Sequence, residues 1–377
     1  MKVYFDNNAS TQLDPCVIAE IEPFIRQYYG NPSSGHWLGK KGKEATEVAR
    51  QRVADLIGAK PHEVIFTSGG SESNNHVLKG VAFARNEKGR HMITSAIEHP
   101  AIINPCRYLE TKGFKVTYVG VDEYGRVKAQ DIERAITDET ILVSVMHANN
   151  ETGTLQPIAE IGKLCKARGV YFHTDAAQSV GKIPVDVDKL NVDLLSVAGH
   201  KFHAPKGVGA LYVREGVDLE PLIHGASHEM GRRAGTENVA GIVGLGKASL
   251  IARERMSEHN KRIAYLRDLL HEKLKRIIDV KLNGHPTERL PNTLNVSFKG
   301  VDSSVWVSKM KDIALSTGSA CHDRVKRPSI ILTAMNVPAE LALGAVRFSL
   351  GRFNTEDEIS YVIDEIQRVV KEVKKSD

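Results

Sequence analysis

Short β-rich runs alternate with helix-length segments between Glu63 and Val213, and this alternation constrains the fold more than any other feature of the sequence. The expected strands are Glu63–Ser68, His91–Ser95, Lys115–Val121, Ile141–Met146, Tyr171–Thr174, Leu194–Val197 and Gly209–Val213. Segments between them, such as Asn75–Arg85 and Ile158–Ala167, have the length and pattern of helices. The alternation predicts an α/β fold with a mostly parallel sheet covered by helices. In such sheets, functional residues gather where strands end and loops begin.

The pattern changes after Gly246. Apolar residues at helical spacing predict a long amphipathic helix with the face Ile263, Leu266, Leu270, Leu274 and Ile277. Beyond it we expect the strands Thr293–Phe298, Ile313–Thr317 and Val346–Leu350, and a terminal helix with the face Ile359, Ile363, Ile366 and Val370. We interpret this part as a smaller α+β domain joined by the N-terminal segment. The expected division is a large domain over residues 15–255 and a small domain over residues 1–14 and 256–377.

Composition excludes several classes of protein. With 26% charged and 41% hydrophobic residues, the chain has the balance of a soluble globular protein. Its net charge of +5 is too small and too dispersed to indicate direct contact with nucleic acid. No apolar run reaches membrane-spanning length, and the N-terminus lacks the apolar core of a signal peptide. The four cysteines form no CxxC pair, which argues for reduced thiols. We therefore expect a cytoplasmic protein without membrane contacts.

A glycine-containing loop, Ser68–Asn74, follows the first expected strand and leads into a helix. Glycine lets the backbone approach a ligand closely, and the N-terminus of a helix presents free N–H groups to an anion, so the loop suits a phosphate. Taken alone, an ordinary capped helix after a tight turn explains it equally well. The sequence lacks GxGxxG after a strand and lacks GxxxxGK[ST], so neither a dinucleotide nor a P-loop nucleotide is expected.

Two charged residues lie at the ends of apolar strands. Asp175 ends one strand, where a carboxylate is costly unless a cation or a helix N-terminus meets it. Lys201 lies between His200 and His203 at a strand-to-loop transition, and a desolvated amine there loses its proton and becomes a nucleophile. A phosphate cradle, an anion for a ring nitrogen and an amine for a covalent bond are together what pyridoxal phosphate requires.

A series of ordered motifs extends this interpretation over nearly the whole chain. The motifs are FDNNAS at Phe5–Ser10, YGNPSS at Tyr29–Ser34, FTSGGSESNN at Phe66–Asn75, IEHPA at Ile97–Ala101, HANNETG at His147–Gly153, HTDAAQ at His173–Gln178, GHKFHAPKGVG at Gly199–Gly209, GRRAGTEN at Gly231–Asn238, STGSAC at Ser316–Cys321 and VRFSLGR at Val346–Arg352. The sequence resembles the cysteine desulfurases of the aminotransferase class V group, within the fold-type I pyridoxal phosphate enzymes. Any one of these motifs alone would be a weak signal.

The resemblance implies a role for each matching residue at the ring of the cofactor. Lys201 is expected to bind pyridoxal phosphate covalently and then to move the Cα proton of the substrate. Asp175 is expected to pair with the ring nitrogen, and His99 to stack on the ring and assist proton transfer. Gln178 is expected at the phenolic oxygen, and Asn150 near that oxygen and the substrate.

The resemblance also implies the groups that hold the phosphate and the substrate. Ser71 and His200, with backbone N–H groups of the Gly70 loop, are expected to bind the phosphate. Thr236 of the partner subunit would complete that cradle, which implies a homodimer. Arg347 is expected to bind the substrate carboxylate with its planar fork.

Cys321 carries the chemistry that distinguishes this family. Basic residues surround it in the sequence, which favours the thiolate, whereas Cys106 and Cys165 have the helical or apolar contexts of inert thiols. The resemblance implies that Cys321, on a long loop of the small domain, attacks the sulfur of L-cysteine. L-alanine would leave, and the persulfide would pass to an acceptor or scaffold protein, for iron–sulfur cluster assembly or other sulfur-containing products.

Some features depart from the family or suggest alternatives. Ser71 replaces the usual threonine, Ala198 replaces a serine that contacts the phosphate, and the residues after Cys321 are unusually basic. The triplet ACH at Ala320–His322 also resembles a motif of selenocysteine lyases, so release of selenium from L-selenocysteine is an alternative activity. An aminotransferase, or a non-catalytic sulfur-relay or scaffold protein on the same fold, are further alternatives. His224 and His228 do not form HExxH, so no metal is expected.

Overall fold

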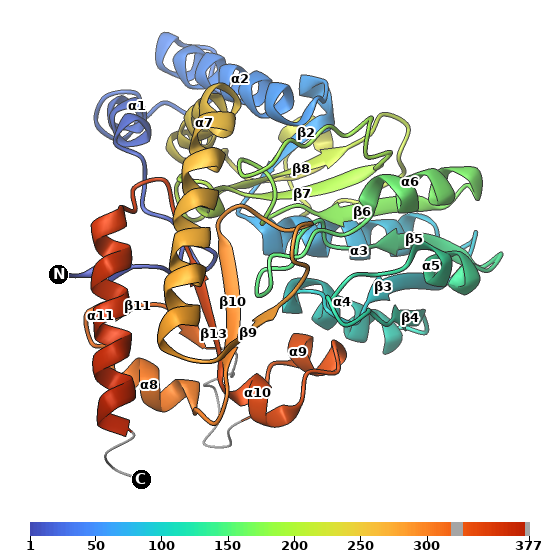
Figure 1. Ribbon diagram of the computed structural model, residues 1–377. Coiled ribbons are helices and arrows are strands. Elements are labelled where there is room, and N and C mark those ends of the chain that lie inside the picture. The colour runs from blue at the N-terminus through green and yellow to red at the C-terminus, as the bar shows by residue number, and fades with distance from the viewer. Residues whose placement is uncertain (318–326, 374–377) are drawn as a thin grey trace.

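The computed structural model describes residues 1–317 and 327–373 (Figure 1). Its larger sheet has the strand order β2-β8-β7-β6-β5-β3-β4. The strands are β2 (Val64–Thr67), β3 (His91–Ser95), β4 (Lys115–Val119), β5 (Thr140–Ser144), β6 (Tyr171–Asp175), β7 (Leu194–Ala198) and β8 (Gly209–Val213). β3 to β7 pair in parallel, while β8 is antiparallel to both of its neighbours. The predicted α/β fold with a mostly parallel sheet is confirmed.

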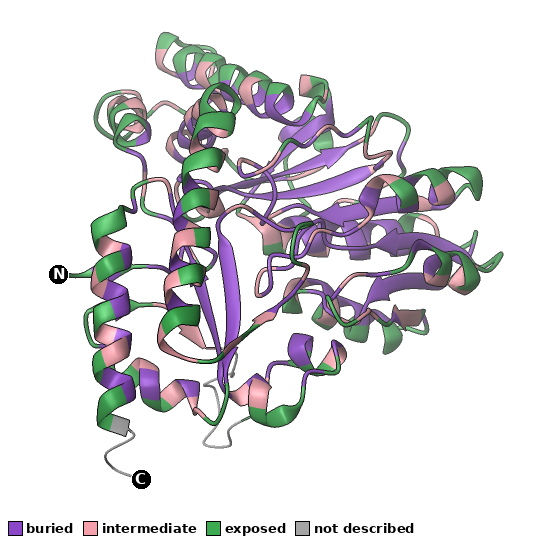
Figure 2. Ribbon diagram, in the orientation of Figure 1, coloured by how far each residue is buried: buried purple, intermediate pink, exposed green. Residues whose placement is uncertain are grey.

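Helices cover both faces of this sheet, as Figure 1 shows. They are α1 (Pro15–Arg26), α2 (Trp37–Ile57), α3 (Gly70–Ala84), α4 (Pro100–Glu110), α5 (Ala129–Ala135), α6 (Ile158–Ala167) and α7 (Val239–Ile277), with the short 3-10 helices η1 (Pro61–Glu63), η2 (Gly199–Lys201) and η3 (Glu229–Gly231). Alternate strand residues face opposite sides: Ile93 and Val143 join one apolar core, and Met92 and Leu142 the other. Both faces are therefore buried, and Figure 2 shows most of the sheet in the buried colour.

A second sheet, antiparallel and in the order β12-β13-β10-β9, forms the centre of the C-terminal part. Its strands are β9 (Val280–Asn283), β10 (Thr293–Phe298), β12 (Ser316–Thr317) and β13 (Ala345–Ser349). The same part of the chain contains α8 (Ser303–Lys309), β11 (Ile313–Ala314), α9 (Ile330–Ala334), α10 (Ala339–Leu343) and α11 (Glu356–Val373), and β11 pairs with β1 (Val3–Tyr4). The expected strand Ile313–Thr317 is two strands, because its first half pairs with β1 and its second half with β13. The N-terminal segment thus packs on the C-terminal part, and Phe5 is fully buried there.

The long helix α7 passes along both parts of the molecule (Figure 1). Leu245 and Ala252 pack in the core beside the large sheet, whereas Ile263 and Leu270 pack in the core of the C-terminal part. The helix continues without a break through residue 255, where we placed the domain boundary. The boundary lies close to the change from one core to the other, and the division into domains stays a prediction.

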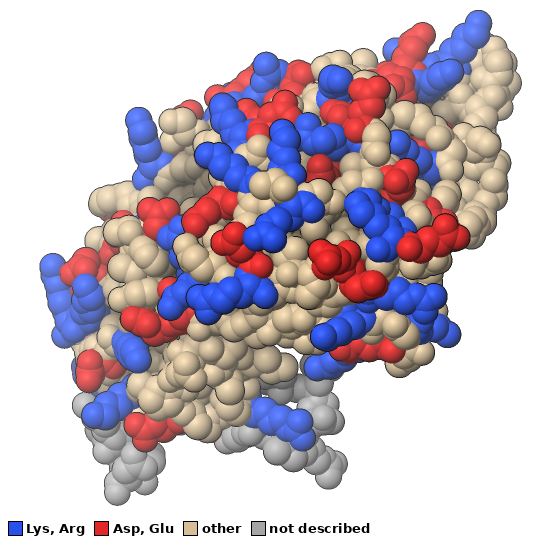
Figure 3. Space-filling model, turned by 90° about the vertical axis from the view of Figure 1, so that its right-hand side faces the viewer, with Lys and Arg blue, Asp and Glu red and all other residues tan. Residues whose placement is uncertain are grey.

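Figure 3 shows basic and acidic side chains interspersed over one face of the molecule, in keeping with the net charge of +5. Among the residues that the structure describes, no helix combines the length and the apolar character needed to cross a membrane.

Candidate active site

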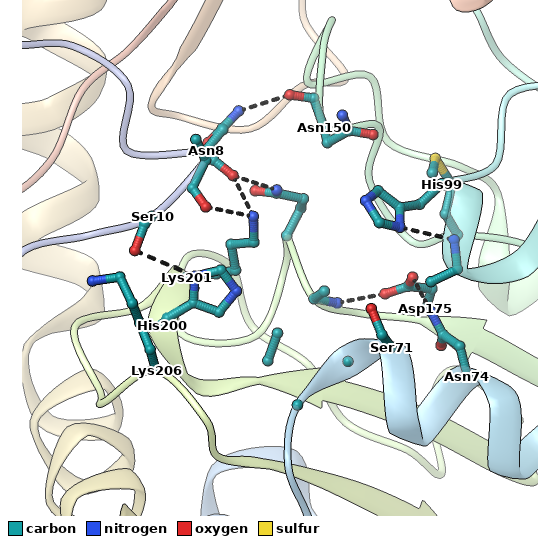
Figure 4. A pocket seen from close by; sticks show the side chains of 18 of the residues that line it. Asn8, Ser10, Ser71, Asn74, His99, Asn150, Asp175, His200, Lys201 and Lys206 are labelled. Carbon is teal, nitrogen blue, oxygen red and sulfur yellow. Dashed lines mark hydrogen bonds between the residues drawn. The ribbon is translucent and has the colours of Figure 1, made fainter. Parts of the chain in front are cut away.

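A pocket of about 680 Å³ lies at the carboxyl ends of β6 and β7, where the N-terminal segment and β13 approach the large sheet. It is lined by these residues predicted from the sequence: Gly70, Ser71, His99, Asn150, Asp175, Gln178, His200, Lys201 and Arg347. Figure 4 shows several of them directed toward one open space. Thr236 is exposed and does not line the pocket of its own chain. Cys321 lies outside the described residues.

One end of the pocket is formed by the first turn of α3. The helix begins at Gly70, earlier than the expected Asn75, because the first N–H groups of a helix need no partner within it and a glycine there costs little. Gly69 has a φ of 148° and provides no side-chain cap, so these N–H groups point toward the pocket unopposed. A Cβ on Gly70 would lie 3.3 Å from the Cβ of Ala198. The N–H groups of this first turn suit a phosphate group, and the carboxylate of Glu72 on the same turn is paired with Arg233 at 2.9 Å.

Two side chains expected to bind the phosphate, Ser71 and His200, line the same pocket, as does Ala198. The hydroxyl of Ser71 is exposed on the first turn of α3. Burial, helped by the charges of Lys201 and Lys206, lowers the pKa of His200 to about 4, so its ring is neutral and keeps one N–H to donate. Ala198 also lines the pocket, but its methyl group donates nothing.

The Asp175 carboxylate accepts two hydrogen bonds at the end of β6, and its pairing with the ring nitrogen of the cofactor stays a prediction. Its Oδ1 accepts a hydrogen bond from the backbone N–H of Ala177 at 2.9 Å, as a cap does. Its Oδ2 accepts one from the Asn74 amide at 2.7 Å. The sequence analysis missed Asn74, although a signal exists: Asn74 shares the buried face of α3 with Val77, Leu78 and Val81. An amide on such a face needs a polar partner.

His99 is oriented by the helix that it caps. Its Nδ1 accepts a hydrogen bond from the backbone N–H of Ala101 at 3.1 Å. Burial lowers the pKa of His99, so the neutral ring carries its proton on the other nitrogen, Nε2. Figure 4 shows the ring directed into the pocket, near Asp175. A flat neutral ring in this place can cover one face of a planar cofactor.

Lys201 reaches the pocket from η2, the short turn after β7. Its Nζ donates hydrogen bonds to the backbone carbonyls of Asn8 at 2.7 Å and of Ala9 at 2.8 Å. Burial, and after it the charge of Arg347, lowers the pKa of Lys201 from 10.5 to about 8. At pH 7 about a tenth of such amines are neutral, far more than for a free lysine. This is the state that forms a covalent bond with an aldehyde.

Arg347, on β13, is already paired with a carboxylate. Its Nη2 donates to Asp6 Oδ1 at 2.6 Å and to Ser316 Oγ at 2.8 Å, and its Nη1 donates to the carbonyl of Asn150 at 2.9 Å. Its Nε is buried without a hydrogen-bond partner among the described residues. The sequence analysis missed Asp6, which lies in an irregular segment without periodic pattern.

Asn8, also missed, connects several of these groups. Its backbone carbonyl accepts from both Lys201 and Gln178, the latter at 2.9 Å. Its side-chain amide donates to the carbonyl of Asn150 at 3.1 Å, a contact drawn in Figure 4. The Oδ1 of Asn150 is buried, and no described residue bonds it. That atom remains available to a ligand in the pocket.

Comparison with known proteins identifies the family. The model of the family described as aminotransferase class-V matches residues 3–362. The chain belongs to the aminotransferase class-V family. The cysteine desulfurase IscS of Methanosarcina thermophila is 49% identical over 374 residues, which cover 99% of this chain and 93% of that protein. The sequence-based recognition of this family is confirmed.

Solved structures of similar proteins agree with the fold. A structure described as a NifS-like protein has a TM-score of 0.93 and 42% identity, and the match covers 98% of this chain and 100% of that one. A structure described as SspA in complex with cysteine has a TM-score of 0.84 and 39% identity, over 94% and 100% of the two chains.

The class-V cysteine desulfurases use pyridoxal phosphate, and the residues of the pocket fit this cofactor. The first turn of α3 offers open N–H groups at one end, Asp175 presents a carboxylate, and Lys201 presents an amine of lowered pKa. The buried Oδ1 of Asn150 still lacks a partner among the described residues. Within those residues, no group of three or more histidine, cysteine, aspartate or glutamate side chains could hold a metal ion.

Proposed function

We propose that this cysteine desulfurase converts L-cysteine to L-alanine with Lys201 as covalent anchor and base and Cys321 as the group that accepts the sulfur. One observation carries the proposal: Lys201, with a pKa of about 8, shares a single pocket with the Asp175 carboxylate and the N-terminus of α3. A non-catalytic scaffold has no need of a buried amine poised in this way.

Pyridoxal phosphate, when bound, supplies an electron sink for the charge that develops at the substrate Cα. The chain's own residues would hold it in place. Ser71, His200 and the N–H groups at Gly70 bind the phosphate, and Asp175, fixed by Asn74, keeps the ring nitrogen protonated. His99 covers one ring face, while Gln178 and Asn150 meet the phenolic oxygen. The geometry that supports these roles is their common lining of the pocket.

The substrate meets three groups of the chain. Arg347 binds its carboxylate with the donors that Asp6 and Asn150 leave open. Lys201 removes the Cα proton, since part of its amine is neutral at physiological pH. The Cys321 thiolate then attacks the substrate sulfur, so that a sulfur–sulfur bond forms and the carbon–sulfur bond breaks. The electron pair stays with carbon, which is protonated to give L-alanine, and a persulfide remains on Cys321.

We also propose that the enzyme is a homodimer and that its persulfide passes to an acceptor or scaffold protein. Thr236 is exposed and away from the pocket of its own chain, as expected of a residue that completes the phosphate site of the partner subunit. Iron–sulfur cluster assembly is the proposed destination, with other sulfur-containing products as the alternative. The thiols of Cys16, Cys106 and Cys165 are free, which supports a cytoplasmic location.

The variant Cys321→Ser tests the proposal. It should keep the bound cofactor, because none of the proposed cofactor contacts is assigned to this thiol. It should form no persulfide and should not accumulate alanine with L-cysteine, since a hydroxyl is a far poorer nucleophile. Alanine and sulfide are measured together. Alanine formation at the rate of the unmodified enzyme would contradict the role of Cys321.

Turnover of L-selenocysteine by the unmodified enzyme, compared with its turnover of L-cysteine, separates the desulfurase from a selenocysteine lyase.

A further inference from the structure

Lys182 is a buried lysine behind the pocket, in the turn that follows β6, and the reaction described above does not use it. The residue is 8% exposed. The charged groups that act on it are the cations Lys201 and Arg347, and no carboxylate of the described residues forms an ion pair with it. Burial of a lysine among cations costs folding free energy. The hydrogen-bond partners of Lys182 therefore indicate its role.

Those contacts are two side-chain amide oxygens. The Nζ of Lys182 donates to Gln178 Oε1 at 2.8 Å and to Asn8 Oδ1 at 3.0 Å. Burial lowers the pKa of Lys182 well below its usual value. Whether charged or neutral, the amine retains at least two N–H groups, which is the number that these contacts use.

The contact with Gln178 decides which way that amide points. A glutamine amide has an oxygen end and a nitrogen end of nearly equal shape. The carbonyl of Asn8 can only accept, and Lys182 has N–H groups to donate, so these two neighbours together place Oε1 at Nζ and Nε2 at the Asn8 carbonyl. One N–H of Nε2 then donates to the carbonyl of Asn8 at 2.9 Å. The second N–H has no partner among the described residues, and Gln178 lines the pocket.

Asn8 is held in the same manner. Its Oδ1 accepts from Lys182 and, at 3.0 Å, from the amide of Asn292. Its Nδ2 donates to Thr293 Oγ1 at 2.8 Å and to the carbonyl of Asn150. Every polar atom of this side chain is engaged, so the backbone carbonyl that meets Gln178 and Lys201 is fixed as well.

We propose that Lys182 is a positioning residue that holds the Gln178 amide with one N–H directed at the phenolic oxygen of pyridoxal phosphate. This inference rests on the proposed role of Gln178. A reversed amide would turn its oxygen toward the phenolate and repel it. An N–H in that place stabilises the phenolate instead, and thereby lowers the pKa that governs the visible absorbance of the Lys201-bound cofactor.

The test is a pH titration of the visible absorbance of the purified holoenzyme. Lys182→Met keeps the length of the side chain but removes its donors. The midpoint should rise by about 1 pH unit, the size of one hydrogen bond to a charged oxygen. Lys182→Arg retains donors, and a cavity of about 40 Å³ beside the residue leaves room, so its midpoint should stay within about 0.3 unit. Lys182→Leu replaces the methionine variant if that variant does not fold.

Lys182→Met in a Gln178→Met background separates the positioning of Gln178 from a direct effect of the Lys182 charge on the cofactor. If Lys182 acts through Gln178, adding Lys182→Met should move the midpoint by less than about 0.3 unit. A full shift in that background, or no shift from Lys182→Met alone, would overturn the proposal. Gln178→Met alone tests the role on which it rests. An unchanged midpoint there would mean that the function assigned to Gln178 has failed, whereas the absorbance of the unmodified enzyme shows independently that the cofactor is bound.

Discussion

Burial determines the chemistry of Lys201. Its amine has a pKa of about 8 because desolvation and the nearby charge of Arg347 disfavour the protonated form. The carbonyls of Asn8 and Ala9 accept its hydrogen bonds without adding a full negative charge that would raise the pKa again. Asp175 and Asp6 oppose the shift only in part.

The lowered pKa predicts how the cofactor-free protein takes up pyridoxal phosphate. Only the neutral amine attacks the aldehyde, so the rate of uptake should rise about tenfold per pH unit from pH 6 to 7 and level off above about pH 8. The increase of visible absorbance after mixing measures this rate. A rate that still rises tenfold per unit beyond pH 9 would mean that the amine has the pKa of an ordinary lysine.

Asp6 presents Arg347 with a carboxylate before any substrate arrives. The two side chains are mostly buried and lie 2.6 Å apart, while Ser316 and the Asn150 carbonyl also hold the guanidinium. The proposed binding at Arg347 would therefore place the substrate carboxylate next to a negative charge.

Asp6→Asn should lower the KM for L-cysteine by about fivefold, equivalent to about 1 kcal/mol, and change kcat by less than about twofold. Steady-state kinetics of alanine release measure both constants, and Asp122→Asn, at a distant turn, serves as the control. A higher KM in Asp6→Asn would show instead that Asp6 mainly orients Arg347.

The regular elements follow closely from local patterns of residues, and the irregular segments do not. The strands of the large sheet were expected within about two residues at each end, since buried parallel strands are continuous apolar runs bounded by turns. Asp175 and Lys201 can be recognised from the sequence, because a charge at the end of a buried strand is unfavourable unless a partner or a function compensates for it. Asp6 and Asn8 belong to an extended segment whose position depends on distant packing, with Asp6 bridged to Ser349 on β13. No local pattern predicts that contact.

The junction between β7 and α3 carries the departure from the family. Ala198 ends β7, and its Cβ faces the first turn of α3 across a narrow gap. The first turn of α3 suits a phosphate group, and the methyl group of Ala198 offers it no hydrogen bond.

Ala198→Ser should therefore tighten the binding of pyridoxal phosphate by about fivefold, because a hydroxyl donor adds about 1 kcal/mol. The rate of cofactor loss on dialysis, followed by absorbance, measures the change. Ala177→Ser, at the nearby turn after β6, is the matched control and should have a smaller effect. Faster cofactor loss from Ala198→Ser would indicate that the gap is too tight for the added oxygen.

The site depends on two parts of the chain that are far apart in sequence. β6 of the large sheet supplies Asp175, and η2, which follows β7, supplies Lys201. The first turn of α3 forms one end of the pocket, and β13 with the N-terminal segment supplies Arg347 and Asn8. α7 packs in both cores and ties the two parts together. The pocket is thus a product of the whole fold, which explains why the motifs that contribute to it are spread over nearly the entire sequence.

The most direct test of this account asks which lysine holds the cofactor. The holoenzyme is reduced with borohydride, digested and mapped by mass spectrometry. We predict one pyridoxyl group per chain, on the peptide that contains Lys201, since its amine has the lowered pKa and lies in the pocket with Asp175. Lys206 also lines the pocket, and Lys182 is buried behind it. A label on Lys182 or Lys206, or no label on a protein supplied with pyridoxal phosphate, would contradict the account.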